Sequence, residues 1–492
     1  MSGTHLIAAA LLVPIIGAAL IAAAGSRPNL REAVTLTTSI ALFAVVLGLL
    51  AGVMSGEDLR LPLLEMFPGI AVGFRLEPLG MLFALVASGL WIVNSIYSIG
   101  YMRGNKEAHQ TRFYVCFALA LAATMGVAFA SNLLTLFLFY ELLTLVTWPL
   151  VTHHGDDKSR AGGRVYLGVL LGTSMGLLLP AVIATWAVAG TLEFTAGGIL
   201  RHAGLSGAAI AGLLALYMFG IGKAALMPVH RWLPAAMVAP TPVSALLHAV
   251  AVVKAGVFTV VKVIVYVFGI DTLSGAGAAN WLAAVAGFTI IAASIVALRA
   301  DNLKRRLAYS TVSQLSYVVL AASLLAPLSI AAAALHIATH AVGKITLFFA
   351  AGAIYTASHK TEVSQLDGIG RRMPWTMGAF GIGALSMIGL PPAAGFASKW
   401  YILSGAVASA QWFAVAVVVV STLLTAGYFL PIVYRAFLLP ESREGGHSVS
   451  HGEAPLAMVC ALSCTAAATV ALFFVPDVPL ALSRALVSGG GQ

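Results

Sequence analysis

Two lysines lie beside helix-breaking residues within otherwise apolar stretches of the sequence. Lys399 follows a pair of prolines in GLPPAAGFASKW, and Lys223 lies in GIGKAALMP. An ammonium group at the centre of a bilayer costs roughly 2.5 to 3.5 kcal/mol even on the mildest scale, so its presence there points to a function. Interrupted helices at matching places in two halves of a membrane protein are typical of a path for ions or substrates at mid-membrane depth.

A carboxylate also lies deep within an apolar stretch: Glu141, in LTLFLFYELLTLVTWPL. A buried carboxylate stays neutral unless a cation lies nearby, and a buried amine is likewise charged only beside a suitable partner. A lysine that alternately pairs with Glu141 and separates from it would therefore hold and release a proton, and our hypothesis is that Lys223 does so. The apolar segments contain several candidate cations: Lys223, Lys254, Lys262, Lys344 and Lys399. For Lys262, an alternative stays open, in which its amine snorkels to the membrane surface.

His336, His340 and Lys344 stand at positions i, i+4 and i+8 of LHIATHAVGKITLFF. This spacing places them along one face of a helix, with side chains about 6 Å apart. A single buried histidine more often has a structural role, but three titratable groups in a row could be bridged by water into a proton relay. His248, after the prolines of APTPVSALLH, is a fourth candidate for this relay.

The composition indicates that these residues are positioned by membrane-spanning helices. Of the 492 residues, 60% are hydrophobic and 9% charged, whereas an ordinary soluble domain has about 25% charged residues. The mean hydropathy is +0.97. We expect an all-α polytopic membrane protein with about 14 spans of roughly 20 residues each, which leaves no stretch for a soluble catalytic domain. The expected spans begin near residues 4, 34, 76, 112, 132, 165, 206, 241, 279, 305, 328, 375, 409 and 455.

The net charge of +9 follows the membrane topology and does not indicate nucleic-acid binding. Lysines and arginines gather in alternate loops, for example at residues 103–112, 158–164 and 304–306, whereas 55–72 and 269–278 are poor in them. The positive-inside rule then places both termini outside the cytoplasm. We expect a multi-pass protein of a bacterial plasma (inner) membrane. The first 24 residues lack a basic beginning, which favours a retained helix over a cleaved signal peptide.

The sequence does not predict a cofactor or a metal site. Its cysteines, Cys116, Cys460 and Cys464, all lie in apolar spans, where packing is the simplest role. It also lacks an iron–sulfur cysteine pattern, a haem motif and a dinucleotide-binding loop. A redox role would therefore have to be performed by other subunits.

We expect one domain that contains two inverted repeats of five helices, each with a broken helix. An odd number of spans makes successive repeats enter the membrane from opposite sides. The expected parts are peripheral helices 1 to 3 in residues 1–111, a first repeat in 112–268 broken near 220–230, a second in 279–437 broken near 390–400, and a loop, last helix and short tail in 438–492.

Five segments carry a resemblance to a known family: FYELLTL, GIGKAALMPVHRWLPAAMVAPTPVSALLHAVAVVKAG, DNLKRRLAYSTVSQLSY, THAVGKITLFFAAGAIY and GLPPAAGFASKW. Together they resemble the antiporter-like subunits of respiratory complex I, membrane-bound hydrogenases and Mrp cation/proton antiporters. The resemblance covers about residues 70–440. Glu141, Lys399 and the short segment after the last expected span make the chain most similar to the D-type subunits of Mrp antiporters, with hydrogenase-type subunits as rivals.

The resemblance implies a role for each candidate residue. Glu141 matches the family's membrane glutamate, Lys223 and Lys399 its broken-helix residues and Lys254 its connecting lysine, while His248, His336, His340 and Lys344 match a central hydrophilic axis. It implies a proton-translocating subunit of a multisubunit antiporter for Na⁺ or another monovalent cation, with two half-channels and other membrane subunits as partners. The protein would then be a transporter and not an enzyme. The alternatives are a proton-pumping subunit of a redox complex and, more distantly, a stand-alone solute carrier or lipid flippase.

Overall fold

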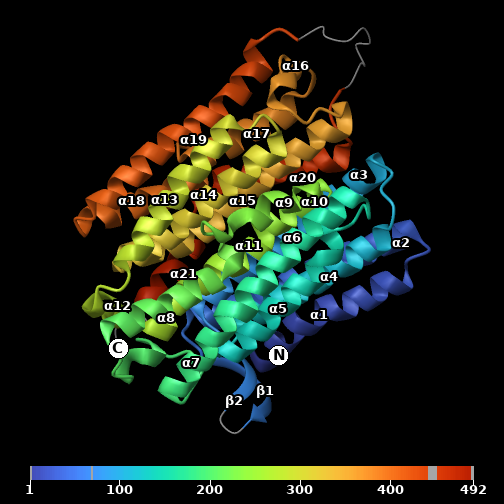
Figure 1. The fold of residues 1–492 in the computed structure, drawn as a ribbon. Coiled ribbons are helices and arrows are strands. Elements are labelled where there is room, and N and C mark those ends of the chain that lie inside the picture. The colour runs from blue at the N-terminus through green and yellow to red at the C-terminus, as the bar shows by residue number, and fades with distance from the viewer. Residues whose placement is uncertain (1–2, 68–69, 442–451, 489–492) are drawn as a thin grey trace.

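The computed structural model describes residues 3–67, 70–441 and 452–488. Within these residues, helices run side by side along most of the molecule (Figure 1). Eleven helical segments are long and apolar enough to cross a membrane. They are α1 (Gly3–Ala23), α2 (Pro28–Met54), α3 (Pro78–Gly104), α4 (Gln110–Phe129), α5 (Leu133–Val151), α6 to α7 (Asp157–Ala189), α10 to η7 (Thr241–Phe268), α13 (Asn280–Arg299), α15 (Pro327–Ser358), α19 (Trp412–Leu438) and α20 (Leu456–Phe474).

The other expected spans coincide with three helices outside that set of eleven, α8 (Gly207–Gly220), α14 (Leu303–Ser323) and α17 (Pro374–Ile388). Helices α8 and α17 are short because each ends at an interruption of the chain. Helix α14 is long, but it begins with LKRR and is rich in serine and threonine, which lowers its hydropathy. The described helices therefore include eleven clear spans where the sequence predicted about fourteen.

Several long segments are composed of consecutive shorter elements. Asp157–Ala189 consists of α6 (Asp157–Thr173), the π-helical turn η1 (Ser174–Leu178) and α7 (Leu179–Ala189). Thr241–Phe268 consists of α10 (Thr241–Ala245), η6 (Leu246–Val250), α11 (Val252–Lys262) and η7 (Val263–Phe268). The remaining short elements are η2 (Ile199–His202), η3 (Gly222–Ala224), η4 (Val229–Arg231), α9 (Trp232–Ala235), η5 (Ala236–Val238), α12 (Ile270–Ala276), η8 (Val363–Gln365), α16 (Ile369–Arg372), α18 (Ala394–Ala408) and α21 (Asp477–Ser488).

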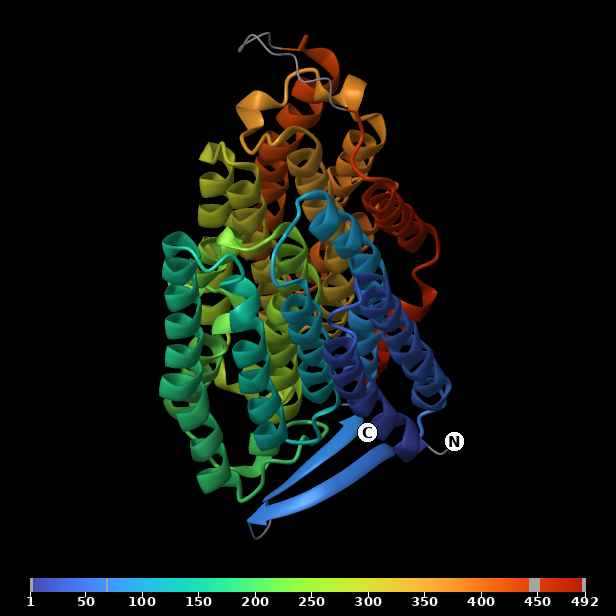
Figure 2. The same cartoon turned by 90° about the vertical axis from the view of Figure 1, so that its right-hand side faces the viewer.

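A β-hairpin occupies the loop between α2 and α3, where the sequence had indicated only a segment poor in basic residues. Strands β1 (Leu59–Phe67) and β2 (Ile70–Leu76) pair antiparallel. The hairpin projects from the end of the helices near which both termini lie (Figure 2). We call this the hairpin end of the molecule. The fold is therefore helical apart from this hairpin and a few isolated bridges among the described residues.

The two most buried spans carry most of the candidate residues. Every residue in the most apolar part of α15 is buried, and the segment from α10 to η7 is nearly as enclosed. By contrast, only about a third of the corresponding part of α1 and α2 is buried. Helix α15 lies among α3, α14, α17, α18 and α20, and the C-terminal helix α21 also packs on α15 and α3. The core of the bundle is thus the place where the titratable side chains gather.

Candidate functional site

The first interruption of the helix lies directly before Lys223. Helix α8 ends at Gly220, and after the short turn η3 the backbone of Ala225 takes a left-handed conformation with φ of 56°. A Cβ atom on Gly222 would lie 2.3 Å from the Thr173 hydroxyl, and one on Gly220 would lie 2.5 Å from the Leu178 backbone nitrogen. The glycines therefore let the broken helix approach α6 and η1 closely.

Helix α11 presses against the other side of this interruption. A Cβ atom on Gly256 would lie 2.3 Å from the carbonyl carbon of Lys223 and 2.4 Å from the backbone nitrogen of Ala224. Gly256 lies two residues after Lys254 on the same helix. The close packing at this glycine therefore fixes the position of one candidate lysine relative to the other.

Lys223 is fully buried, and helix α5 supplies the partners of its amine. Its Nζ donates to the Tyr140 carbonyl oxygen at 2.7 Å and to the Thr144 hydroxyl at 2.6 Å. The amine also lies 3.3 Å from the centre of the Tyr140 ring, a cation–π arrangement. The Lys223 backbone nitrogen donates to the Tyr140 hydroxyl at 3.1 Å. One turn of α5 thus holds both the backbone and the side chain of this lysine.

Glu141 lies in the same turn of α5, but its carboxylate makes no ion pair with Lys223 within the described residues. The carboxylate is buried, and neither of its oxygens accepts a hydrogen bond from a described residue. Tyr140 and Thr144 share a helix face because they are four residues apart, whereas Glu141 points about 100° away around α5. The structure therefore brings Glu141 and Lys223 to one level of the bundle without the direct pairing in our hypothesis.

Lys254 connects α11 to α15. Its Nζ lies 2.5 Å from His340 Nδ1, and both side chains are fully buried or nearly so. The rings of His340 and His336 lie one turn apart with centroids 5.9 Å apart. His336 Nδ1 in turn lies 2.8 Å from the hydroxyl of Ser398. Hydrogen bonds and ring contacts thus link α11, α15 and α18 across the core.

Lys399 lies in α18, a few residues beyond the second interruption. Helix α17 ends at Ile388, and Gly389 follows with φ of 88°. The Lys399 amine donates to the carbonyl oxygens of Met387 at 2.7 Å and Ile388 at 3.1 Å. These are the last carbonyls of α17, so the lysine caps the negative end of a broken helix. The amine also lies 4.6 Å from the centre of the Tyr317 ring.

Lys344 and His248 contact adjacent residues of the same helix, α14. Lys344 Nζ donates to the Ser310 hydroxyl at 2.9 Å, and His248 Nδ1 lies 3.1 Å from the hydroxyl of the adjacent Thr311. The Tyr428 hydroxyl from α19 also bonds to Ser310 at 3.3 Å. His340 and Lys344 lie one turn apart on α15, which places this group one turn along the helix from the Lys254 group. The structure therefore gathers His248, Lys254, His336, His340, Lys344 and Lys399 around α15, with Lys223 and Glu141 on the far side of α11.

Some groups of this site had no signal in the sequence. The amine partners Tyr140, Thr144 and Ser310 are ordinary uncharged polar residues, and no charge marks them. Ser398 does have a signal, because its hydroxyl lies directly before the candidate Lys399 in the sequence. The Nε2 atoms of His248, His336 and His340 and both Glu141 oxygens lack a hydrogen bond among the described residues. Such buried groups need a partner, and water is the obvious one in a polar track.

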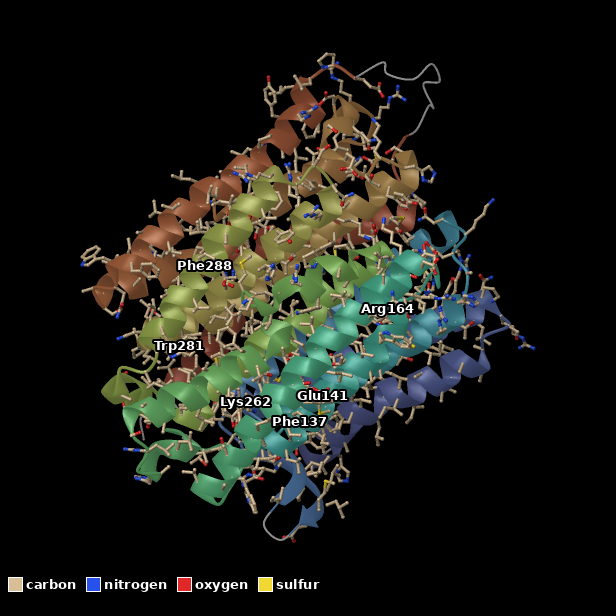
Figure 3. All side chains as sticks on the ribbon, in the orientation of Figure 1. Phe137, Glu141, Arg164, Lys262, Trp281 and Phe288 are labelled. Atoms are coloured by element: carbon tan, nitrogen blue, oxygen red, sulfur yellow. The ribbon has the colours of Figure 1, made fainter. Side chains whose placement is uncertain are left out.

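The Lys262 amine does not lie where a lysine that snorkels to the membrane surface would place it. Its side chain is fully buried, and its Nζ lies 3.3 Å from Glu77 Oε2 and donates to the Ala130 carbonyl oxygen at 2.9 Å. The snorkelling alternative is therefore wrong for this residue, which is labelled in Figure 3 together with Glu141. Glu77, immediately before α3, was not a candidate in the sequence.

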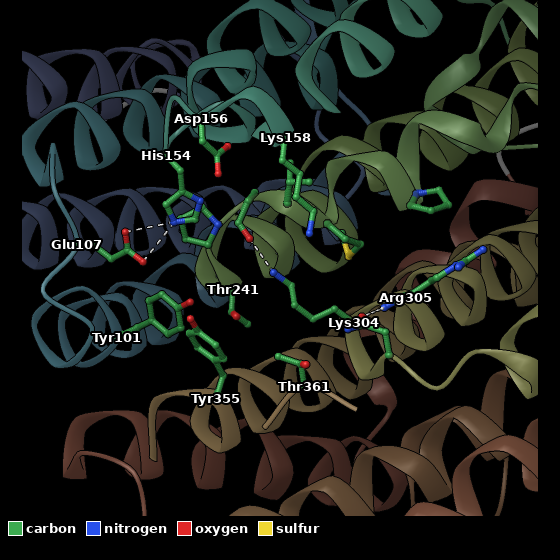
Figure 4. Close-up of a pocket in the computed structure, with 16 residues that line it drawn as sticks. Tyr101, Glu107, His154, Asp156, Lys158, Thr241, Lys304, Arg305, Tyr355 and Thr361 are labelled. Atoms are coloured by element: carbon green, nitrogen blue, oxygen red, sulfur yellow. Dashed lines mark hydrogen bonds and ion pairs between the residues drawn. The ribbon is translucent and has the colours of Figure 1, made fainter. Parts of the chain in front are cut away.

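A polar pocket of about 460 Å³ lies among the loops that follow α3, α5 and α13 (Figure 4), at the end of α3 away from the hairpin. Glu107 lies 3.5 Å from His154 Nε2 and raises the pKa of that imidazole, whereas burial lowers the pKa of His153 to about 4. Lys304 reaches the Ala239 carbonyl oxygen at 2.7 Å. Thr241 also lines this pocket and begins α10, so a polar opening lies at the start of the segment that carries His248.

Comparison with known proteins places this geometry in a family. Residues 130–425 match the family described as NADH:quinone oxidoreductase/Mrp antiporter, TM, and residues 68–114 match the complex I chain 5 N-terminus. The chain is 33% identical over 435 residues to NADH-quinone oxidoreductase subunit N of Desulforudis audaxviator (strain MP104C), with 85% of each chain covered. It is 32% identical to the A/B component of a probable K⁺/H⁺ antiporter of Rhizobium meliloti (strain 1021), covering 73% of this chain but 36% of that protein.

Two solved structures share the fold over nearly the whole chain. A chain of the Mrp complex from Dietzia sp. DQ12-45-1b superposes with a TM-score of 0.85 at 23% identity, covering 98% of this chain and 97% of that one. A chain of the membrane-bound sulfane sulfur reductase, an archaeal respiratory membrane complex, superposes with a TM-score of 0.86 at 22% identity, covering 99% and 98%. At these identities, the likeness concerns the fold.

Proposed function

Because the chain belongs to the NADH:quinone oxidoreductase/Mrp antiporter family of membrane subunits, we propose that it conducts protons in a multisubunit assembly, as the D-type component of an Mrp antiporter. In this proposal, proton influx drives the efflux of Na⁺ or another monovalent cation. The cation passes mostly through other subunits, because Glu141 is the one carboxylate deep in an expected span and a lysine lies at its level. The chain itself is a multi-pass membrane protein.

The observation that carries the proposal is the contact between Lys254 and His340. This contact joins α11 and α15, two buried helices that belong to different expected repeats. A lysine and an imidazole in direct contact can pass a proton between them, because each nitrogen can serve as donor or acceptor depending on its protonation. The adjacent His336 and Ser398 then extend the contact toward Lys399.

In the proposed path, protons enter a half-channel toward Lys223, cross by Lys254 to the histidines of α15, and leave near Lys399. Glu141 gates the first step. In the present arrangement, the Lys223 amine bonds to neutral groups of α5, so a proton there is held without the carboxylate. If the Lys223 amine moves from these neutral groups to Glu141, the carboxylate favours proton uptake. The side chains of α15 then need only water to complete their hydrogen bonds.

The proposal also includes the arrangement expected from the sequence. Residues 112–268 and 279–437 form two inverted five-helix repeats, supported by the interruptions after Gly220 and Ile388 in their fourth helices. Both termini lie on the non-cytoplasmic side of a bacterial plasma membrane, which agrees with their shared place at the hairpin end (Figure 2). The partners of this chain in the proposal are the other membrane subunits of the assembly.

A second candidate is a proton-pumping subunit of a redox complex. It is favoured by the 33% identity to an NADH-quinone oxidoreductase subunit N over 85% of both chains. Both candidates use the same buried residues, and they differ in what drives the protons.

The test is to isolate the chain from its native membrane in mild detergent and identify every bound protein by mass spectrometry, with iron and flavin assays. Small hydrophobic partners without iron or flavin, together with Na⁺-dependent proton transport, are expected. Bound iron–sulfur proteins or flavoproteins would contradict the Mrp assignment and support the redox candidate.

A further inference from the structure

A second buried carboxylate and lysine pair lies outside the proposed path. Lys262 is the last residue of α11, and Glu77 immediately precedes α3. The Lys262 amine lies 3.3 Å from Glu77 Oε2 and 4.3 Å from the centre of the Phe194 ring. Both side chains are buried, although Glu77 retains 8% exposure. A pair so enclosed has to be explained, because removing two charges from water is costly.

Glu77 lies at the inner wall of a pocket near the hairpin end. This pocket, of about 290 Å³, is lined by Glu77 and Tyr266 and by the charged side chains of Glu57, Asp58 and Arg75. Glu57 and Asp58 are exposed, so the pocket is open to the surroundings of the hairpin. Lys262 is absent from the lining. Glu77 therefore lies between the pocket and the buried lysine.

The hydrogen bonding of Glu77 is incomplete. Its Oε2 atom accepts no hydrogen bond from a described residue, although it faces the Lys262 ammonium. A carboxylate oxygen has lone pairs for more than one donor, so this atom has capacity for a proton or a water molecule. No group of three or more histidine, cysteine, aspartate or glutamate side chains in the described residues is placed to hold a metal ion. The chemistry of the pocket therefore fits a proton better than a metal ion.

Helix α11 connects this pair to the proposed path. Lys254 and Lys262 lie eight residues apart on it, which corresponds to about 12 Å along the helix. Gly256, between them, lies against the backbone of Lys223. One fully buried helix thus carries Lys254 near one end and Lys262 at the other.

We propose that Glu77 and Lys262 form a proton port at the hairpin end, which connects the pocket to Lys254 on the buried path. The inference rests on the proposed function and adds an opening to its two half-channels. A proton from pocket water binds Glu77 Oε2 and moves to the neutral Lys262 amine, which leaves a carboxylate beside an ammonium. The ammonium then passes its proton toward Lys254 along α11, where Thr259 is the polar side chain between the two lysines, and the reverse sequence releases a proton.

The rival explanation is a structural ion pair that ties α3 to α11. The two explanations predict different results when both side chains of the pair are replaced by apolar side chains of similar volume. Replacing both partners of a buried ion pair by apolar residues is often neutral or stabilising, whereas removing one partner destabilises. The variant Glu77→Leu/Lys262→Met would therefore retain a structural function but lose a proton port.

The first test measures proton transport in membrane vesicles that contain the whole assembly with this double replacement. We expect normal assembly and at least a tenfold loss of transport. Transport equal to the wild type in the assembled double variant would overturn the port. Lys223→Ala is measured in the same vesicles to separate the two claims. If that variant is inactive while the double variant is normal, only the port is wrong; if Lys223→Ala transports normally, the proposed function fails and the port with it.

A second test does not depend on assembly of the double variant. Glu77→Cys is introduced with Cys116, Cys460 and Cys464 replaced by serine, and a membrane-impermeant maleimide is added from each side of the membrane. We expect labelling from the hairpin end only. The matched control is Met81→Cys, one turn into α3 and fully buried, which should stay unlabelled. An unlabelled Glu77→Cys, or equal labelling of both positions, would contradict the port.

Discussion

Gly256→Ala tests whether close packing of α11 on the first helix interruption is required for transport. The added Cβ atom would lie 2.3 Å from the Lys223 carbonyl carbon, where ordinary contact begins at 3.4 Å, so α11 and the interruption must separate by about 1 Å. Overpacking of this kind costs about 1–3 kcal/mol. The better helix propensity of alanine offsets roughly 1 kcal/mol of that cost. Folding should therefore survive with a modest loss of stability.

Transport should respond far more strongly than stability. A displacement of about 1 Å in a reacting geometry can reduce a rate roughly 100-fold, and Gly256 lies two residues from Lys254. We expect a loss of this order in proton transport by vesicles that contain the assembly, with a small decrease in its thermal stability. The matched control is Gly212→Ala in α8, where a Cβ would meet no heavy atom within 4 Å. Wild-type transport by an assembled Gly256→Ala variant would show that this close packing is not required for transport.

Further substitutions test the individual buried groups. Lys223→Ala and Glu141→Ala should each abolish coupled transport while the chain still inserts, and wild-type antiport in a well-expressed Lys223→Ala assembly would contradict the first half of the path. Thr144→Val removes a hydroxyl partner of the Lys223 amine; a hydrogen bond to a charged group contributes about 1.5–3 kcal/mol, so we expect transport to fall at least tenfold, measured as the initial rate at saturating cation. Lys399→Ala should slow proton exit more than it lowers the amount of assembled complex on native gels, and normal pH-dependent transport would argue against an exit there. Ser398→Ala breaks the contact with His336 and should reduce the same exit step, with Ser398→Thr as the conservative variant that restores it.

Residue spacing within a helix predicted part of the site. Positions i, i+4 and i+8 placed His336, His340 and Lys344 on buried α15, and the structure gives the two imidazoles a ring contact. The third group does not continue the row, because the Lys344 amine extends to Ser310 on α14. Helical periodicity gives the face of a residue, but the partner of a long side chain depends on which neighbouring helix supplies an acceptor.

The contacts between distant segments could not be predicted from the sequence. Glu77 and Lys262 are far apart in the chain, and each looks like an ordinary charge near the end of a span. The partners of Lys223 are a backbone carbonyl and a threonine hydroxyl, which no charge pattern marks. The hairpin also has only a weak signal in the sequence, because its loop contains several charged residues and Pro62 interrupts the first strand pattern.

The count of spans shows how helix interruptions affect a prediction from hydropathy. Windows of about 20 residues predicted separate spans beginning near 206 and 375. In the structure, α8 and α17 end at Gly220 and Ile388, so each is too short to cross a membrane as one regular helix. The glycines and prolines at the two interruptions, beside the candidate lysines, therefore also make these spans irregular.

The most direct test of the central claim is proton transport by the whole assembly when the contact between Lys254 and His340 is removed. His340→Leu leaves the buried amine without its imidazole partner, and Lys254→Met/His340→Leu removes both polar groups. We measure the proton flux of vesicles at equal amounts of assembled complex, with His202→Leu, at an exposed position of η2 outside the site, as the control. We expect both variants to lose transport, and the double variant to regain stability without regaining flux. Wild-type flux in either variant would contradict a proton path along this buried axis.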